Sequence, residues 1–198
     1  MFPSALLIDG GYLRAIASKS GIHYTPDFIE KFARRCYDPA KEDLRRILYY
    51  DCAQYRGKQT LPVSGRLKEF QGSDKWLDDL AERELFAVRK GVLAFRGWQP
   101  RRIPIAGDTL SDEDFKPIFE QKGVDMRVGL DIAVISATKT IQRIILVSSD
   151  TDMIPAMKHG RKEGVQIVVV QLPMPAAQSL APRILHHSDF KRLVGWPT

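Results

Sequence analysis

Short runs of hydrophobic residues alternate along the chain with segments whose apolar residues recur every three or four positions. The runs are Ala5–Ile8, Ile47–Tyr50, Val92–Phe95, Ile144–Val147 and Val165–Val170. Continuous runs of this length are typical of strands that a parallel sheet buries on both faces, and the spacing between them is that of amphipathic helices. The alternation predicts a doubly wound α/β sandwich with a mainly parallel, five-stranded sheet, as one domain over residues 1–198.

Capping residues mark several of the expected helices. Thr25 and Pro26 suit the N-cap and first position of a helix, and Gly21, Gly91 and Gly164 suit helix ends. We expect helices over 12–20, 26–36, 75–90, 125–135 and 153–162, and a terminal helix over 176–193 interrupted near Pro182. Residues 54–65 and 97–104 read as loops after strand ends and 67–70 as a short helix, whereas 108–121 has no clear pattern.

Composition narrows the class of protein. The formal net charge is +6 and the pI is about 9.4, which permits a polyanionic partner such as RNA. The two cysteines, Cys36 and Cys52, form no CxxC pair, so neither a zinc site nor a disulfide framework is indicated. Neither a signal peptide nor a run of transmembrane length is present. We expect a cytoplasmic protein without a membrane partner, and self-association stays open.

Carboxylates follow two of the buried runs directly. The first run ends in Asp9-Gly10-Gly11, and the fourth is followed by Ser148-Ser149-Asp150-Thr151-Asp152. In the common strand order 3-2-1-4-5 the first and fourth strands are neighbours, so these carboxylates would share the ligand-binding edge of the sheet. Like charges gathered there repel unless a cation or a proton joins them, and a divalent metal suits oxygen ligands.

Two further carboxylates belong to the helix that precedes the fourth strand. Asp125 lies in its first turn and could overhang the same edge; Asp131 lies among apolar residues, where it needs an ion pair or a metal. The carboxylates other than Asp131 also have a structural alternative, because Asp9 and either Asp150 or Asp152 could cap helices and Asp125 could serve the helix dipole.

Three short motifs, in this order and spacing, resemble a known family. They are Asp9-Gly10, the segment Lys122-Gly123-Val124-Asp125 with Asp131, and Ser148 to Met153. They resemble the NYN domain, within the PIN-like nuclease superfamily, and the likeness runs through nearly the whole chain. The closing segment with Leu185, Asp189, Phe190 and Leu193 is similar too. One departure is Tyr12, which stands where the family often has Asn.

The resemblance implies a PIN-like three-layer fold and a ribonuclease that depends on Mg²⁺ or Mn²⁺. Its substrate and partner would be RNA. The catalytic set would be Asp9, Asp125, Asp131, Asp150 and Asp152, with Asp9, Asp131, Asp150 and Asp152 as metal ligands. Metal ions held by carboxylates polarise a phosphodiester and activate a water, which suits hydrolysis.

Several other side chains are candidates for substrate binding. Ser148 and Ser149 could bond a phosphate or a metal water, and Lys122 could contact substrate. The basic residues expected just past strand ends could meet phosphates; these are Arg56, Lys58, Arg101 and Arg102. The leading hypothesis is a metal-dependent endoribonuclease. The alternative is an RNA-binding or regulatory module that has the same fold and little or no activity, which Tyr12 keeps open.

Overall fold

The architecture is a three-layer α/β/α sandwich around a mostly parallel sheet, seen in a computed structural model that describes residues 1–104, 109–173, 180 and 182–197. The strands of the main sheet have the order β6-β5-β2-β1-β7-β8-β9. Their bounds are β1 Phe2–Asp9, β2 Glu42–Cys52, β5 Phe86–Pro100, β6 Phe115–Lys122, β7 Arg143–Val147, β8 Gln166–Gln171 and β9 Phe190–Leu193. All neighbours are parallel except β5 and β6.

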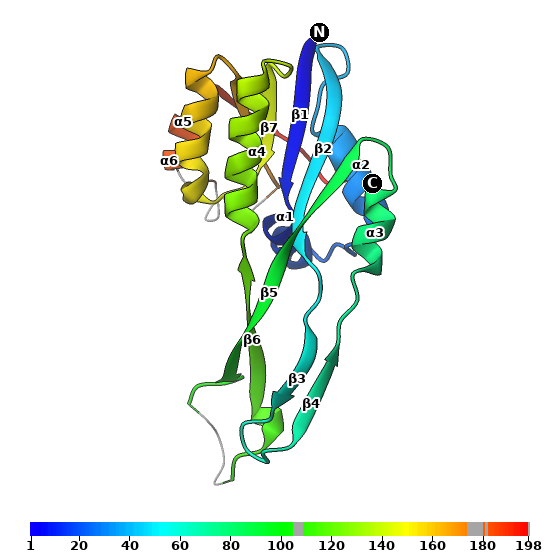
Figure 1. Cartoon of the computed structure of the whole chain (residues 1–198), viewed down its shortest axis with the longest axis vertical. Helices are drawn as coiled ribbons and strands as arrows, with labels where there is room; N and C mark the ends of the chain where they lie inside the picture. The colour runs from blue at the N-terminus through cyan, green and yellow to red at the C-terminus, as the bar shows by residue number, and fades with distance from the viewer. Residues whose placement is uncertain (105–108, 174–179, 181, 198) are drawn as a thin grey trace.

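Helices cover both faces of this sheet (Figure 1). One face packs on α1 Gly10–Lys19, α2 Pro26–Arg35 and α3 Lys75–Ala81, and the other on α4 Val124–Thr138, α5 Ile154–Lys162 and α6 Pro182–His186. Alternate residues of each central strand enter the two cores: Leu6 and Ile8 face α1 to α3, whereas Ala5 and Leu7 face α4 to α6. This two-sided burial explains why the central strands are continuous apolar runs. No helix of the described residues is long and apolar enough to cross a membrane.

The sheet is larger than the sequence predicted. It has seven strands rather than five, because β6 and β9 add an edge strand on each side. The terminal helix expected over 176–193 is wrong in part: α6 ends at His186, and Phe190–Leu193 pairs with β8 as β9. Residues 176–179 and 181 lie outside the described residues. Edge strands escape the pattern because one side of each is solvated, and here their residues are mostly exposed or half-buried.

Two segments read as a loop and a short helix instead form a hairpin. Strand β3 (Arg56–Thr60) pairs antiparallel with β4 (Leu67–Gln71). The helix expected over 75–90 is also wrong beyond Ala81, because α3 ends there and β5 begins at Phe86 to pair with β2. The segment from Gly97, which the sequence predicted to be a loop, continues β5 as far as Pro100 and pairs with β6. Pairing with another strand has overridden the local spacing in each case.

Together, the hairpin β3–β4 and the ribbon β5–β6 form an arm that extends from the body (Figure 1). We call residues 54–72 and 92–122 the arm, described here without 105–108. Five half-buried aromatic rings hold its two layers together, with centroid separations between 5.3 and 6.3 Å for the contacting pairs: Tyr55, Phe70, Phe95, Trp98 and Phe119. None of them belongs to either core of the body. The arm is therefore stabilised by its own small aromatic cluster.

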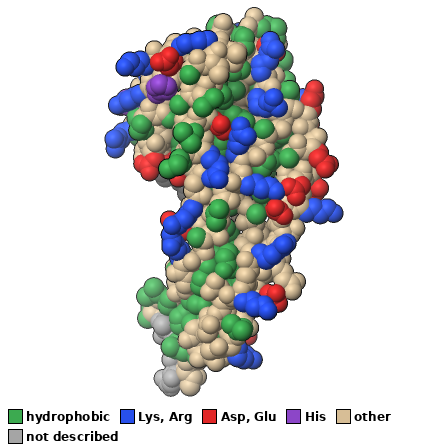
Figure 2. Space-filling view, viewed as in Figure 1, with side chains coloured by type: hydrophobic (Ala, Val, Ile, Leu, Met, Phe, Trp, Pro, Cys, Tyr) green, Lys and Arg blue, Asp and Glu red, His purple; other side chains and the backbone are tan. Residues whose placement is uncertain are grey.

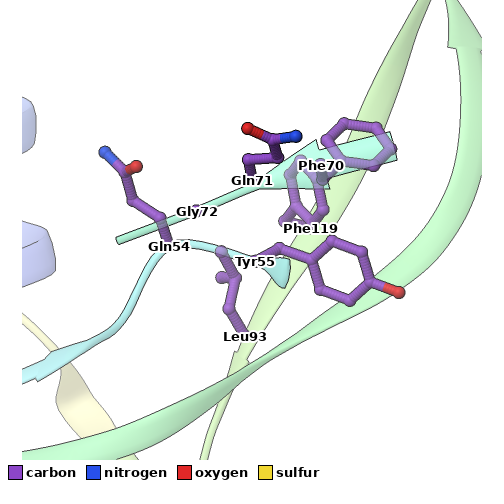
Figure 3. Close-up of a pocket in the computed structure, with 7 residues that line it drawn as sticks. All are labelled: Gln54, Tyr55, Phe70, Gln71, Gly72, Leu93 and Phe119. Atoms are coloured by element: carbon purple, nitrogen blue, oxygen red, sulfur yellow. The ribbon is translucent and has the colours of Figure 1, made fainter. Parts of the chain in front are cut away.

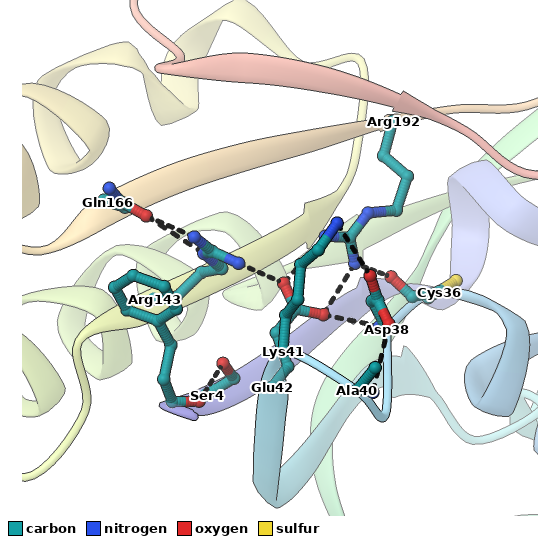
Figure 4. Close-up of polar contacts among 10 residues, drawn as sticks. Ser4, Cys36, Asp38, Ala40, Lys41, Glu42, Arg143, Gln166 and Arg192 are labelled. Atoms are coloured by element: carbon teal, nitrogen blue, oxygen red, sulfur yellow. Dashed lines mark hydrogen bonds and ion pairs between the residues drawn. The ribbon is translucent and has the colours of Figure 1, made fainter.

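A buried ionic cluster fastens the amino-terminal ends of the central strands (Figure 4). Glu42, with no exposed side-chain surface, accepts hydrogen bonds from Arg143 at 2.7 Å and from Arg192 at 2.7 and 2.8 Å. Arg143 also donates to Gln166, and Arg192 to the Cys36 carbonyl. The cluster thus joins the amino ends of β2, β7 and β8 to Arg192 of β9. These amino ends lie opposite to the edge where Asp9 and Asp150 lie.

Candidate active site

Four of the five predicted catalytic carboxylates lie at the carboxyl edge of the sheet. Asp9 ends β1, and its Oδ1 accepts a hydrogen bond of 3.0 Å from the Tyr12 amide, which caps α1. Asp150 follows β7 and caps the short 3-10 turn η2 (Thr151–Met153) by accepting from the Asp152 amide at 2.8 Å. The capping roles that the sequence left open are therefore confirmed for Asp9 and Asp150, and each fixes the direction of a carboxylate, whereas Asp152 caps no helix among the described residues.

Ser148 connects the two strand ends. Its hydroxyl donates to Asp9 Oδ2 at 3.3 Å and accepts from the Asp150 amide at 3.1 Å. This buried serine therefore holds the residues after β1 and β7 in register with each other. Neighbouring Ser149 forms a hydrogen bond with the hydroxyl of Tyr12, and that contact places the tyrosine at the same edge.

Asp125 completes the group from the beginning of α4. Partial burial and the charges of Asp150 and Asp152 raise the pKa of Asp125. Burial, together with the charges of Asp125 and Asp51, raises the pKa of Asp9, although hydrogen bonds from Tyr12 and Ser148 partly offset this. Asp9, Asp125, Asp150 and Asp152 thus form a connected set of like charges, which we call the acidic edge.

No basic side chain of the described residues forms an ion pair with the acidic edge, although the protein is basic overall. Charged oxygens that repel one another and have no cationic partner suit a divalent cation. Within the part of the chain that the structure describes, however, no three acidic, histidine or cysteine side chains are arranged closely enough to hold a metal as they stand. The carboxylate oxygens of the acidic edge are suitable ligands for a divalent metal. Their side chains would have to move closer together to complete a metal site.

Asp131, the fifth predicted residue, lies elsewhere. It follows Asp125 by six residues on α4, about 9 Å along the helix axis. Its carboxylate accepts hydrogen bonds from the Tyr50 hydroxyl at 2.9 Å and from Arg89 at 3.0 Å. Ion pairing, one of the two explanations that the sequence offered for a carboxylate among apolar neighbours, accounts for it, and the structure does not bring it to the acidic edge.

The sequence missed Asp51, the second-to-last residue of β2, which lies near Asp9 at the carboxyl edge. This fully buried carboxylate pairs with Arg14 at 2.6 Å and accepts from Tyr49 at 3.1 Å and Gln121 at 2.9 Å. The rule that identified Asp9 also applies here, because the second hydrophobic run ends in a carboxylate in the same way. These donors satisfy the hydrogen-bonding capacity of the Asp51 carboxylate, so its role is structural. It holds Arg14 and Gln121 in position beside the acidic edge.

The predicted substrate-binding bases lie on the arm or at its junction with the body. Lys122 is exposed at the end of β6, three residues before Asp125. Arg56 donates to the Gly72 carbonyl, and Arg101 to the carbonyls of Glu113 and Phe115, so both brace the arm's backbone. Lys58 and Arg102 are exposed. The expectation that Arg101 and Arg102 border the acidic edge is wrong, because β5 continues past Gly91 for nine residues, about 30 Å of strand.

Comparison with solved structures finds a similar fold. A crystal structure of a protein of unknown function from Vibrio parahaemolyticus RIMD 2210633 superposes with a TM-score of 0.55 at 13% sequence identity, covering 97% of this chain and 92% of the other. At that identity the likeness concerns the fold alone. No curated protein sequence matches the chain.

The family assignment rests on the sequence match and agrees with the motifs at the acidic edge. The model of the NYN domain matches residues 3–186, a range that includes Asp9, Asp125, Asp150 and Asp152. The chain belongs to the NYN domain family.

Proposed function

We propose that the protein is a metal-dependent endoribonuclease that hydrolyses RNA phosphodiester bonds at the acidic edge. NYN domains are a family of PIN-like nucleases, which supports a nuclease role. The observation that carries the proposal is the set of four carboxylates that meet at the acidic edge without a basic partner among the described residues. There the charges of Asp150 and Asp152 add to burial in raising the pKa of Asp125, and the charge of Asp125 does the same for Asp9. A structural cluster would be expected to include compensating cations.

The residues of the acidic edge fit distinct tasks in this reaction. Asp9, Asp125 and Asp150 would hold Mg²⁺ or Mn²⁺, with Asp152 as a further ligand or a partner of bound water. When bound, the ion polarises the phosphodiester and lowers the pKa of an attacking water. Ser148 keeps Asp9 and Asp150 oriented through its two hydrogen bonds. Side chains fixed in this way lose little freedom on binding, which favours catalysis.

Tyr12, at the position where the family often has Asn, can act as a hydrogen-bond donor at the acidic edge. Burial and the neighbouring charge of Asp9 raise the pKa of Tyr12 to about 12, although its hydrogen bond with Ser149 lowers it. Its hydroxyl keeps its proton at neutral pH, as an ordinary phenol does, and can donate to a phosphate oxygen. A polar contact is thus available here through a longer side chain.

The test is cleavage of labelled RNA by the purified protein with Mn²⁺, with Mg²⁺ and with EDTA. Asp150→Asn should lower the metal-dependent rate at least about 100-fold. Loss of a residue that merely hydrogen-bonds a metal ligand typically costs about 10- to 100-fold, and loss of a ligand itself should cost more. Asn still caps a helix well, so the fold should persist. Asp79→Asn, at an exposed position on α3, is the matched control and should cleave normally. Wild-type activity in Asp150→Asn would contradict the assignment.

The second candidate function is an RNA-binding module with little or no activity. Tyr12 at the usual Asn position and the absence of a preassembled metal cluster among the described residues favour it. Binding of labelled RNA without cleavage in any metal would select this alternative.

A further inference from the structure

Two cavities meet where the arm joins the body. The first, about 360 Å³, lies between the layers of the arm and is lined by Tyr55, Phe70, Phe119 and Leu93 among others. The second, about 340 Å³, lies towards α1 and α3 and is lined by residues that include Arg14 and Trp76. Gln54 and Leu93 line both cavities. The two therefore adjoin, and we call them together the arm cleft.

The first cavity combines aromatic surface with amide groups. Figure 3 shows the rings of Tyr55, Phe70 and Phe119 gathered together, with the amide of Gln71 beside them and that of Gln54 farther away. Tyr55 lies 5.6 Å from Phe70 and 5.3 Å from Phe119 by ring centroids, and all three rings are only half-buried. Half-buried rings with polar neighbours offer both stacking surface and edge contacts, which are the two features that a nucleobase uses.

The second cavity shares its wall with the acidic edge. Arg14 and Gln121 line it, and both bond to Asp51, at 2.6 and 2.9 Å. A Cβ placed on Gly11 would lie 2.7 Å from Gln121 Oε1 and 3.4 Å from Asp9 Oδ1. The second cavity and Asp9 are therefore separated by little more than Gly11. An RNA strand that lies in the arm cleft would lead towards Asp9.

The charges around the arm cleft suit a polyanion. Arg14 is 40% exposed although it is paired, and Arg56 and Lys58 project from β3. Lys68 lies over the rings of Phe70 and Trp98, at 5.5 and 5.8 Å from their centroids. Lys and Arg side chains are also spread along the visible face from the body to the arm (Figure 2). Cations interleaved with aromatic rings are typical of sites for single-stranded nucleic acid.

We propose that the arm cleft binds consecutive unpaired nucleotides of the RNA and delivers the adjoining phosphate to the acidic edge. The inference rests on, and deepens, the proposed ribonuclease function by assigning its substrate as single-stranded. Each cavity falls in the volume range of small-ligand pockets, ~300–1,000 Å³. Bases within a duplex are stacked on both faces and cannot enter such cavities, whereas unpaired bases can.

Binding in EDTA tests the proposal independently of cleavage. The probe is a fluorescein-labelled single-stranded RNA of about ten nucleotides, long enough for one such site, and the readout is fluorescence anisotropy. Leu93→Trp should fill the junction of the two cavities and weaken binding roughly tenfold, as expected when a stacking site is lost. Val92→Trp is the matched control: Val92 is 62% exposed, lines neither cavity and should tolerate the same substitution.

The addition of a negative charge gives a second variant with little risk to folding. Gln54 is exposed, so Gln54→Glu should fold, yet it places a negative charge at the centre of the arm cleft and should weaken binding several-fold. Gln99→Glu, exposed farther along β5, is its control. The same RNA annealed to its complement should also bind at least about tenfold more weakly than the single strand.

The outcomes separate this inference from the proposed function. Loss of binding in Leu93→Trp and Gln54→Glu with unchanged controls supports the arm cleft, even if the protein proves not to cleave. If both variants bind the single strand as wild type does, or if the duplex binds equally well, the arm cleft is not the site for unpaired nucleotides, even if Asp150→Asn abolishes cleavage.

Discussion

The ionic cluster at the amino ends of the strands predicts a large and pH-dependent loss of stability in Glu42→Gln. The substitution keeps the shape of the side chain and removes its charge, which leaves Arg143 and Arg192 facing each other. Although burial alone would raise it, hydrogen bonds from Arg192, the Asp38 amide and Arg143 lower the pKa of Glu42 from 4.5 to about 2. This difference corresponds to roughly 3 kcal/mol of folding free energy, at about 1.4 kcal/mol per pH unit.

An independent comparison gives a similar size. Breaking a buried ion pair by removing one partner costs about 3–5 kcal/mol. Arg143 keeps its bonds to Gln166 and its place over the Phe2 ring at 4.1 Å, and Arg192 keeps the Cys36 carbonyl. We therefore expect the lower end of that range, about 3 kcal/mol, at neutral pH.

The sign of the pH dependence follows from the lowered pKa. A carboxylate that is more acidic in the folded protein stabilises it above the unfolded pKa, and this stabilisation disappears as the pH falls from 4.5 towards 2. Urea unfolding of wild type and Glu42→Gln at a series of pH values should show their difference shrinking through that window.

Asp43→Asn provides the control, because Asp43 is half-exposed beside Glu42 and, within the described part of the chain, its ion pair is with exposed Arg45. Its loss should cost less than about 1 kcal/mol. A cost in Glu42→Gln no larger than that of Asp43→Asn, or a difference that does not change with pH, would refute the reasoning.

Two further predictions concern the acidic edge. Asp125→Asn should raise the thermal midpoint in metal-free buffer at pH 7 by roughly 1–3 °C, which corresponds to a gain in stability of up to ~1 kcal/mol after allowing for solvent screening. Because burial and the charges of Asp150 and Asp152 raise the pKa of Asp125, this gain should vanish as the pH falls below about 4. An unchanged midpoint in calorimetry would contradict the mutual repulsion. Mn²⁺ should stabilise the wild type increasingly with concentration, and Asp9→Asn/Asp150→Asn should lose most of that shift; equal shifts in both proteins would place the metal elsewhere.

The sequence by itself determined the centre of this protein. Strands that are buried on both faces must be hydrophobic at every position, so β1, β7 and β8 are visible as continuous runs. Helix starts depend on bonds within a few residues, which is why Thr25, whose hydroxyl accepts from the Phe28 amide at 3.2 Å, could be recognised as a cap. Asp9 and Asp150 follow from the same local logic, since they end or follow such strands.

The tertiary structure decided what depends on distant partners. The arm strands β3 and β4 are mostly exposed and carry no continuous hydrophobic run, so only their pairing with each other and packing on β5 and β6 make them strands. The sequence allowed Asp131 to bind either a metal or a basic residue. In the folded protein Arg89, which is 42 residues away in sequence, forms an ion pair with it. Glu42 meets Arg192 across 150 residues of sequence. Contacts of this range leave no periodic trace, because each requires the chain to have folded before the two partners can meet.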